Sequence, residues 1–292
     1  MGARTAAKVS RVLRSSQLSK ISWLVHGFST RQGGVSKAYG GWSLNLGFTK
    51  HDSRLAVERN RQIFLRQLDE DGRKSWPLVT LRQIHSDLIH RIDTVAEHPL
   101  TGDGLITSTP GILLAVQTAD CLPLILVDVR QHAIGVFHAG WRGTLQRIAQ
   151  KGVGEMRRFF GTEPQNIKAA IGPGIHGCCY QVGAEVREQF ESQFAHATIL
   201  FREVKESDPI REKYPLLFLS ARPPGHSEWQ TKIFLDLVEA NRRQLMEVGV
   251  APKNISASDL CSACRPDLLF SYRADKGVTG RMMGVVGIHR KP

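Results

Sequence analysis

The 292-residue sequence contains no apolar stretch long enough to cross a membrane. A membrane-spanning helix needs about 18 or more consecutive apolar residues, whereas the longest apolar runs here, such as residues 122–127, have the length of a β-strand. Hydrophobic residues make up 41% of the chain and charged residues 23%, which is unlike a disordered or fibrous protein. We therefore expect a soluble globular protein with a sizeable core and no membrane role.

Glycine motifs that bind nucleotide phosphates are also missing. Neither Gly33-Gly34 nor Gly172-Pro173-Gly174 fits the spacing Gly-x-x-x-x-Gly-Lys or Gly-x-Gly-x-x-Gly. The sequence therefore implies no nucleotide cofactor. It also shows no fixed-period repeat, no low-complexity tract and no linker that separates two cores.

Cysteines are few, and their odd number, five, argues against a disulfide framework. Because no export signal is recognisable, metal binding or thiol chemistry is favoured over disulfides. Cys261 and Cys264 have the spacing of a zinc ribbon and could pair with Cys178 and Cys179. Adjacent cysteines fit a tetrahedral site poorly, however, so we expect ordinary buried thiols over a second metal or a disulfide.

Acidic residues are absent from residues 1–20, which carry five Lys and Arg of a chain whose formal net charge is +12. This segment is expected to be a flexible basic leader; it resembles a transit peptide but also suits a frayed bacterial N-terminus. No secretory apolar segment follows, so the expected compartment is the cytoplasm. Because no basic stripe is interleaved with aromatic residues, we do not expect dedicated nucleic-acid binding.

Hydrophobic periodicity predicts a mixture of strands and helices. Residues 112–116, 122–127, 133–138 and 167–171 favour strands, and residues 268–272 and 283–288 favour two more near the end. Residues 53–68, with Ser53 as N-cap, favour a helix, as do residues 145–160, 183–194 and 233–248. The prediction is an α+β fold, with residues 21–292 forming a single compact domain of mixed β-sheets flanked by helices.

Two histidines and one cysteine carry the strongest chemical signal. His85 lies in RQIHSD (residues 82–87), Cys121 in QTADCLP (117–123) and His138 in FHAGWRG (137–143). Imidazole nitrogen and thiolate sulfur are good zinc ligands, and three of them leave a fourth tetrahedral position for water or substrate. Their spacing matches no short metal motif, so buried structural roles for the three residues remain an alternative.

These segments resemble the multicopper polyphenol oxidase or laccase-domain family, also described as purine nucleoside phosphorylases of the YfiH and LACC1 type. The resemblance extends to HGFSTRQGGVS (26–36), SLNLG (43–47), IGPGI (171–175), CCYQVG (178–183), FSYR (270–273) and TGRM (279–282). It implies a YfiH-like fold and a catalytic zinc ion bound by His85, Cys121 and His138. One departure is Ala274, where the family often has a second basic residue.

Three further residues are candidate substrate contacts. Arg31 and Arg142 have guanidinium groups that match an anionic group bidentately, and Asn45 is a candidate hydrogen-bonding residue. Each has a structural alternative, such as a surface or ion-paired arginine. Asp120, next to Cys121, suits the orientation of a ligand, proton transfer, or a capping or turn role, while Asp87 and His26 are weaker candidates.

The resemblance implies a zinc-dependent enzyme whose partners are a purine nucleoside and phosphate. The implied reactions are phosphorolysis of adenosine, inosine, guanosine or S-methyl-5'-thioadenosine, together with adenosine deamination. The alternatives are a copper-dependent polyphenol oxidase, an editing enzyme for peptidoglycan precursors, and a non-enzymatic nucleic-acid-binding protein stabilised by zinc. Multicopper chemistry needs several histidine clusters, and the recognisable site has only two histidines and one thiol.

Overall fold

Side chains on strand β9 (Leu113–Thr118) alternate between two buried faces, as the two-residue period of a strand requires. Leu113 packs in a cluster with Phe64 of helix α1 (Arg54–Leu68). The next residue, Leu114, packs in a different cluster on the opposite face. Strand β9 therefore lies in an inner layer, between a helix and a second sheet.

The computed structural model describes residues 12–68, 76–95, 98–205 and 231–290. The chain divides into two compact units, the first formed by residues 1–175 and 237–292 and the second by residues 176–236. From the sequence we expected one domain over residues 21–292. The first boundary lies just after Gly172, Pro173 and Gly174, and at the second a strand is followed directly by a helix. The single domain stays a prediction.

The first unit contains two large sheets and a small one. The five-stranded sheet has the order β1 (Val12–Leu13), β2 (Leu24–Ser29), β17 (Met282–Ile288), β9 and β4 (Leu78–Val79). The six-stranded sheet has the order β16 (Ile255–Ala257), β12 (Ile167–Ile171), β10 (Leu122–Asp128), β11 (Ala133–Ala139), β8 (Gly104–Thr107) and β6 (Ile89–Arg91). Strands β5 (Leu81–Arg82) and β7 (Leu100–Thr101) form the small sheet, and β3 (Gln32–Ser36) lies beside α1.

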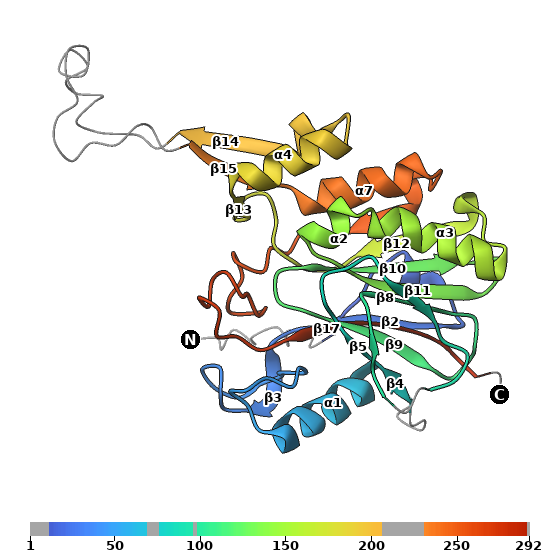
Figure 1. The fold of residues 1–292 in the computed structure, drawn as a ribbon. Coiled ribbons are helices and arrows are strands. Elements are labelled where there is room, and N and C mark those ends of the chain that lie inside the picture. Colours follow the sequence, from blue (N-terminus) through green and yellow to red (C-terminus); the bar gives the residue numbers. More distant parts are fainter. Residues whose placement is uncertain (1–11, 69–75, 96–97, 206–230, 291–292) are drawn as a thin grey trace, which may run out of the picture. The chain divides into compact units, whose positions relative to one another are not determined.

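Within this unit the two large sheets are stacked and helices cover their outer faces (Figure 1). Helix α1 lies against the five-stranded sheet. Helices α2 (Trp141–Leu145), α3 (Ile148–Phe160) and α7 (Leu237–Glu247) lie on the six-stranded sheet. The core between the sheets is made of aliphatic residues from both, so burial of these strands on both faces stabilises the stack.

The second unit has a small core of its own. Its sheet has the order β13 (Gln181–Val182), β15 (Thr231–Leu235) and β14 (Phe201–Lys205), accompanied by helix α4 (Ala184–Gln193). Phe190 of α4 is fully buried and meets Phe201 edge to face, with ring centroids 5.8 Å apart.

Short 3-10 helices occur in both units. They occupy Leu18–Lys20, Pro164–Asn166 and Pro252–Asn254 in the first unit and Ala197–Leu200 in the second.

The predicted α+β class with mixed sheets is confirmed, since parallel and antiparallel pairs occur in both large sheets. The helix over residues 54–68 is confirmed, and the Ser53 hydroxyl accepts the Ala56 N–H bond that caps it. The helix expected over 145–160 is confirmed for residues 148–160. Its start differs, because Arg147 adopts a left-handed conformation and separates α2 from α3. The strand expected over 268–272 is also wrong, because this segment forms turns.

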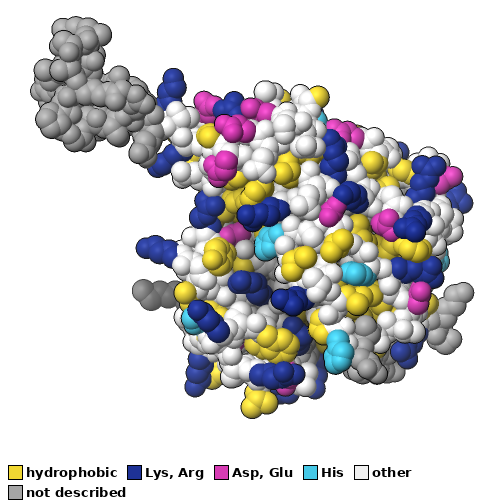
Figure 2. Space-filling view, viewed as in Figure 1, with side chains coloured by type: hydrophobic (Ala, Val, Ile, Leu, Met, Phe, Trp, Pro, Cys, Tyr) yellow, Lys and Arg dark blue, Asp and Glu magenta, His cyan; other side chains and the backbone are white. Residues whose placement is uncertain are grey.

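The expected flexible leader over residues 1–20 is wrong for its second part. Residues 1–11 lie outside the described residues, but Val12 and Leu13 pair with β2 and Leu18 is fully buried. The helices that the structure describes include none long and apolar enough to traverse a bilayer. On the face shown in Figure 2, Lys and Arg side chains lie among apolar and uncharged surface.

Candidate metal centre

Four neighbouring strands bring the predicted ligands to one edge of the six-stranded sheet. Cys121 directly precedes β10, and His138 lies near the end of the antiparallel strand β11. Asp103 directly precedes β8, which is antiparallel to β11, and His85 precedes β6, which is parallel to β8. Because of these directions, all four residues lie at the same edge.

The donor atoms of His85, Cys121 and His138 all lie within 4.8 Å of one another. The two imidazole rings meet edge to face, with centroids 4.8 Å apart. His138 is only 4% exposed, Cys121 is half-buried and His85 is exposed. The set therefore has a buried side, where β11 fixes one ligand, and an open side.

Gly140 gives the cysteine room. The β10–β11 register pairs Leu122 with Ala139, so Cys121 lies opposite Gly140 when the register continues by one residue. A Cβ atom on Gly140 would lie 2.8 Å from the Cys121 Sγ and 3.2 Å from the His85 Cδ2. Glycine is needed here for space, because the Gly140 backbone is extended, with φ −81°.

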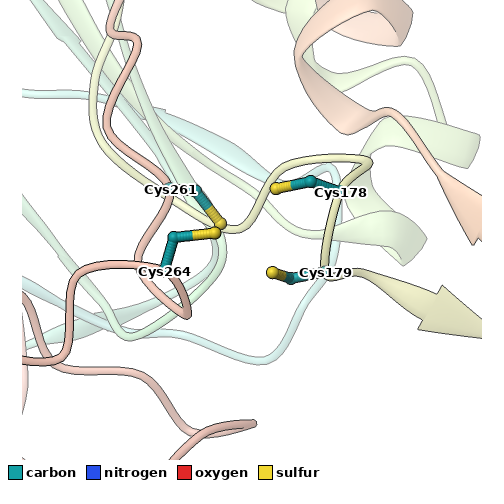
Figure 3. A group of neighbouring side chains, drawn as sticks. All are labelled: Cys178, Cys179, Cys261 and Cys264. Carbon is teal, nitrogen blue, oxygen red and sulfur yellow. The ribbon is translucent and has the colours of Figure 1, made fainter.

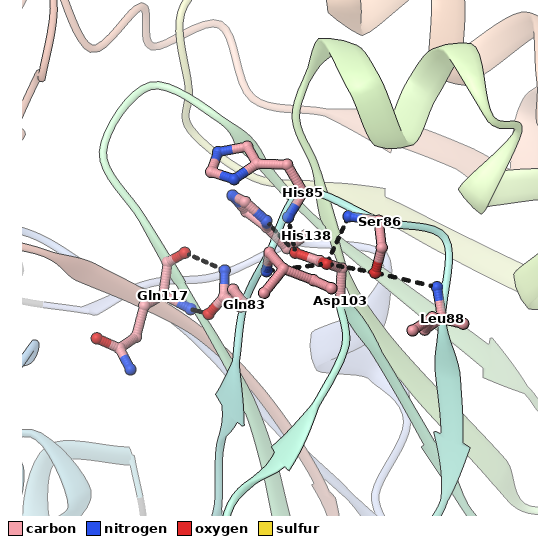
Figure 4. Close-up of polar contacts among 8 residues, drawn as sticks. Gln83, His85, Ser86, Leu88, Asp103, Gln117 and His138 are labelled. Atoms are coloured by element: carbon pink, nitrogen blue, oxygen red, sulfur yellow. Dashed lines mark hydrogen bonds and ion pairs between the residues drawn. The ribbon is translucent and has the colours of Figure 1, made fainter.

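Asp103, which the sequence analysis did not single out, holds two of the three ligands (Figure 4). Its side chain is fully buried, and His138 donates its Nδ1–H bond to Asp103 Oδ1 over 2.8 Å. The same oxygen accepts the His85 backbone N–H at 3.1 Å. The other oxygen, Oδ2, accepts the backbone N–H groups of Ile84 and Ser86 at 3.2 and 2.6 Å and the Ser86 hydroxyl at 2.7 Å.

Gln83 is a second residue that the sequence analysis missed. Its side-chain amide exchanges two hydrogen bonds with the backbone of Gln117 in β9, at 2.7 and 2.8 Å (Figure 4). The segment carrying His85 is thus tied to the five-stranded sheet by Gln83 and to the six-stranded sheet by Asp103. A glutamine among polar loop residues gives no chemical signal, so no sequence feature pointed to it.

Charges within the site favour a thiolate beside a protonated imidazole. Burial by itself raises the pKa of the Cys121 thiol, but the His138 charge and hydrogen bonds from both histidines outweigh burial and lower it. Burial by itself lowers the pKa of His138, whereas the Cys121 thiolate and the Asp103 carboxylate raise it. The thiolate is the form that binds metal ions, so the site stabilises the required state of its sulfur ligand.

Asp120, the residue before Cys121, is fixed in position by hydrogen bonds from residues 262–273. It has a left-handed backbone, with φ 93°, and its Oδ1 accepts hydrogen bonds from the hydroxyls of Ser262 and Ser271, both at 2.6 Å. Its Oδ2 accepts the backbone N–H of Arg273 at 2.7 Å. These contacts explain why residues 268–272 form turns in place of a strand, and they favour the positioning role for Asp120 over proton transfer.

Arg31 and Asn45 are engaged with the protein itself. Arg31 donates to the carbonyl oxygens of Pro266 and Tyr39, at 2.6 and 2.8 Å, and its guanidinium lies 4.8 Å from the centroid of the Phe270 ring. Asn45 is fully buried, and its carboxamide bonds Gly47, Asp52 and the backbone N–H of Arg281. These contacts give both residues structural roles, and their substrate roles stay predictions.

Arg142 differs from those two residues. It belongs to α2, which starts directly after the His138 segment, and its side chain is exposed. Its guanidinium carbon lies 4.4 Å from the Trp141 ring centroid, and no hydrogen bond or ion pair to it occurs among the described residues. Of the weaker candidates, Asp87 forms an ion pair with Lys151, and His26 accepts the Ser15 backbone N–H at 3.1 Å.

The other four cysteines occur as two pairs (Figure 3). Cys261 and Cys264 belong to the first unit and Cys178 and Cys179 to the second, and within each pair the Sγ atoms lie within 4.8 Å. Cys178 and Cys264 are exposed, so the expectation of ordinary buried thiols is wrong for them. Neither pair forms a disulfide.

The ligand set suits a catalytic zinc site better than a closed structural one. Two imidazoles and one thiolate match the three protein ligands of catalytic zinc sites, which keep a fourth position for water or substrate. The Asp103–His138 hydrogen bond is the carboxylate partner that metal-binding histidines normally have. The residues present therefore fit a bound metal ion.

Comparisons with known proteins cover most of the chain. Residues 25–289 match the family model described as multi-copper polyphenol oxidoreductase laccase. A purine nucleoside phosphorylase of Deinococcus radiodurans is 37% identical over 271 residues, which span 91% of this chain and 90% of that protein. The adenosine deaminase RL5, from an unknown prokaryotic organism, is 36% identical over 278 residues, which span 91% of this chain and 94% of that protein.

A solved structure agrees with this assignment. The crystal structure of the hypothetical protein YfiH from Bacillus licheniformis superposes with a TM-score of 0.79 at 28% identity. The superposition covers 96% of this chain and 97% of that protein, so the fold is shared throughout. The sequence match and the shared fold together show that this chain belongs to the multi-copper polyphenol oxidoreductase laccase family.

Proposed function

We propose that this chain is a zinc-dependent enzyme that cleaves purine nucleosides with phosphate and deaminates adenosine with water. The observation that carries the proposal is the three-donor group of His85, Cys121 and His138, which leaves a coordination position open. Relatives over 91% of the chain are named purine nucleoside phosphorylase and adenosine deaminase. Those names supply the substrate class, and the site supplies the chemistry.

The chain's own residues suit zinc. When bound, zinc would polarise a substrate atom or lower the pKa of a water molecule. The buried His138 and Asp103 fix the inner side of the site, while the exposed His85 lies on the side open to substrate. Adenosine, inosine, guanosine and S-methyl-5'-thioadenosine are the proposed nucleosides, and the cytoplasm is the expected compartment.

Arg142 is the proposed binding residue for the phosphate. Its exposed guanidinium follows the His138 segment and has no hydrogen-bond partner among the described residues. Guanidinium groups match phosphate oxygens bidentately. Arg31 and Asn45 stay in the proposal as secondary contacts, which would have to give up protein hydrogen bonds in order to bind substrate.

A second candidate is copper-dependent phenol oxidation, which the description of the family model favours. Among the described residues, however, only one group with metal-binding geometry contains histidine. Copper oxidases that reduce oxygen need several histidine-rich sites, and thiolate with imidazole in a tetrahedral set also suits zinc. We therefore rank this function second.

The test is to incubate the metal-loaded protein with adenosine, with and without phosphate, and to identify every product by mass. Phosphorolysis gives adenine and ribose 1-phosphate only when phosphate is present. Deamination consumes water and gives inosine and ammonia in either condition. We expect both reactions, and about one zinc ion per chain by elemental analysis.

Variants locate the activity. Cys121→Ala should lose metal and both reactions while remaining folded, because it removes one of three ligands. Cys264→Ala, which removes an exposed thiol outside this ligand set, is the matched control and should retain them. Intact nucleosides together with copper-dependent oxidation of phenols would make the second candidate the correct one.

A further inference from the structure

The Asp103 side chain accepts five hydrogen bonds, and two of them come from the histidine ligands. Two donors reach Oδ1, the His138 Nδ1–H and the His85 backbone N–H, and three reach Oδ2, from Ile84 and Ser86. The residue is also bonded to His138 through the backbone, since the His138 N–H donates to the Asp103 carbonyl at 2.7 Å. Asp103 is thus hydrogen-bonded to both histidine ligands, to one through its ring and to the other through its backbone.

We propose that Asp103 is the positioning residue that assembles the metal site, by selecting the tautomer of His138 and the backbone conformation of His85. The proposal rests on the metal site of the proposed function, but it does not depend on which nucleoside reaction takes place.

The first step concerns His138. A neutral imidazole carries its proton on one nitrogen and binds metal through the other. Asp103 Oδ1 accepts only when His138 Nδ1 carries hydrogen, so the carboxylate fixes the proton there. Because Nδ1 is engaged by Asp103, Nε2 is the nitrogen left to bind the metal once it has lost its proton.

The second step concerns His85, whose backbone has a positive φ of 60°. This conformation costs a non-glycine residue of the order of 1 kcal/mol or more unless the surroundings stabilise it. Three successive N–H groups, from Ile84, His85 and Ser86, point to the Asp103 carboxylate. Such a run of N–H groups forms a concave anion-binding nest, so the carboxylate stabilises the turn that directs His85 toward the site.

Asp103→Asn tests both steps because it keeps the shape and removes one acceptor. The new NH2 group cannot accept a hydrogen bond. If it occupies the Oδ1 position, His138 is driven to the tautomer with hydrogen on Nε2, the nitrogen needed for metal. If it occupies the Oδ2 position, it opposes the three donors that hold the His85 turn.

Asp128→Asn is the matched control. Asp128 is also fully buried, and its Oδ1 accepts the backbone N–H groups of Arg130 and Gln131 at 2.8 and 3.1 Å. It is the last residue of β10, at the end of the strand opposite to Cys121. This variant loses a buried carboxylate without touching the ligand set.

The experiment titrates metal-free protein with Co²⁺ and follows the visible bands of the tetrahedral ion and its thiolate charge-transfer band, without any nucleoside. We expect Asp103→Asn to bind Co²⁺ about 10- to 100-fold more weakly than wild type, with a weakened or shifted spectrum, and Asp128→Asn to bind it as wild type does. Equal affinity and spectra in Asp103→Asn and wild type overturn the proposal, as does an equal loss in the Asp128→Asn control.

A second measurement covers the case in which Asp103→Asn does not fold. In zinc-loaded wild-type protein, ¹⁵N-resolved spectra of the histidine side chains should show His138 with hydrogen on Nδ1 and metal on Nε2. Metal on His138 Nδ1 overturns the proposal. If wild type binds metal as expected but leaves purine nucleosides intact, the proposed function fails while the role of Asp103 stands.

Discussion

Acidification should destabilise the protein through His26, a buried histidine outside the candidate metal centre. His26 lies in β2, is 3% exposed and accepts the Ser15 backbone N–H through Nε2 at 3.1 Å. Burial lowers the pKa of His26 from 6.5 to about 4, and the nearby Arg14 charge adds to the effect. The folded protein therefore holds this side chain neutral at pH values where the unfolded chain is already protonated.

The sign and size of the effect follow from this difference in pKa. Between pH 6.5 and about 4 the unfolded chain binds more protons, so the free energy of unfolding falls as the pH falls through this window. The stability is fully present above about pH 6.5. The pKa of His26 is about 2.5 lower in the folded protein than in the unfolded chain. At about 1.4 kcal/mol for each pH unit, the free energy of unfolding falls by about 3 kcal/mol by pH 4.

The assay is urea denaturation at several pH values between 7.5 and 4, with metal-free wild type and the variant His26→Gln. Glutamine can still accept the Ser15 N–H bond but does not titrate. We expect wild type to lose about 3 kcal/mol more than the variant over this range, since the other titrating groups are common to both. His51→Gln, at an exposed histidine, is the control and should follow wild type. If His26→Gln loses as much as wild type, the reasoning about His26 is wrong.

Three further substitutions test the site and the core. Gly140→Ala should lower zinc content and activity about 10-fold or more, because the added Cβ would collide with the Cys121 thiolate. The free energy of unfolding should change little, and a normal zinc content would contradict the prediction. Phe137→Ala, at a fully buried ring, should lower the free energy of unfolding by about 3–5 kcal/mol in urea titrations. Arg31→Ala should lower it by about 1–2 kcal/mol without loss of zinc, whereas a raised KM for phosphate at unchanged stability would restore its role in substrate binding.

The sequence predicted most of what places the ligands. Apolar runs over residues 122–127 and 133–138 predicted two strands that the structure confirms as β10 and β11. A strand buried on both faces has a nearly continuous apolar sequence, which is why these strands were clear. Their ends place Cys121 and His138 at one edge of a sheet, although the ligand assignment itself came from the family resemblance.

Asp103 could not be assigned from the sequence, because its role depends on long-range register. Its contact with His138 requires β8 to pair with β11, and its contact with His85 requires the turn before β6 to lie beside β8. The one local signal is that it lies between Gly102 and Gly104. A Cβ on Gly104 would lie 2.8 Å from the Phe137 ring, so the flanking glycines indicate close packing around a buried carboxylate.

The segments around Arg31 and Asn45 show why recognisable motifs do not distinguish catalysis from architecture. Asn45 accepts the backbone N–H of Arg281 at 2.8 Å, and the Leu46 N–H donates to the Arg281 carbonyl at 2.9 Å. Arg31 bonds the Pro266 carbonyl in the same way, across 235 residues of sequence. A polar side chain that satisfies buried backbone groups is constrained as tightly as one that binds substrate, because leaving such groups unpaired costs about 1–3 kcal/mol each. Arg31 and Asn45 are therefore explained by their contacts with Pro266 and Arg281. Arg142, whose side chain has no such contact among the described residues, is the better candidate for the anion.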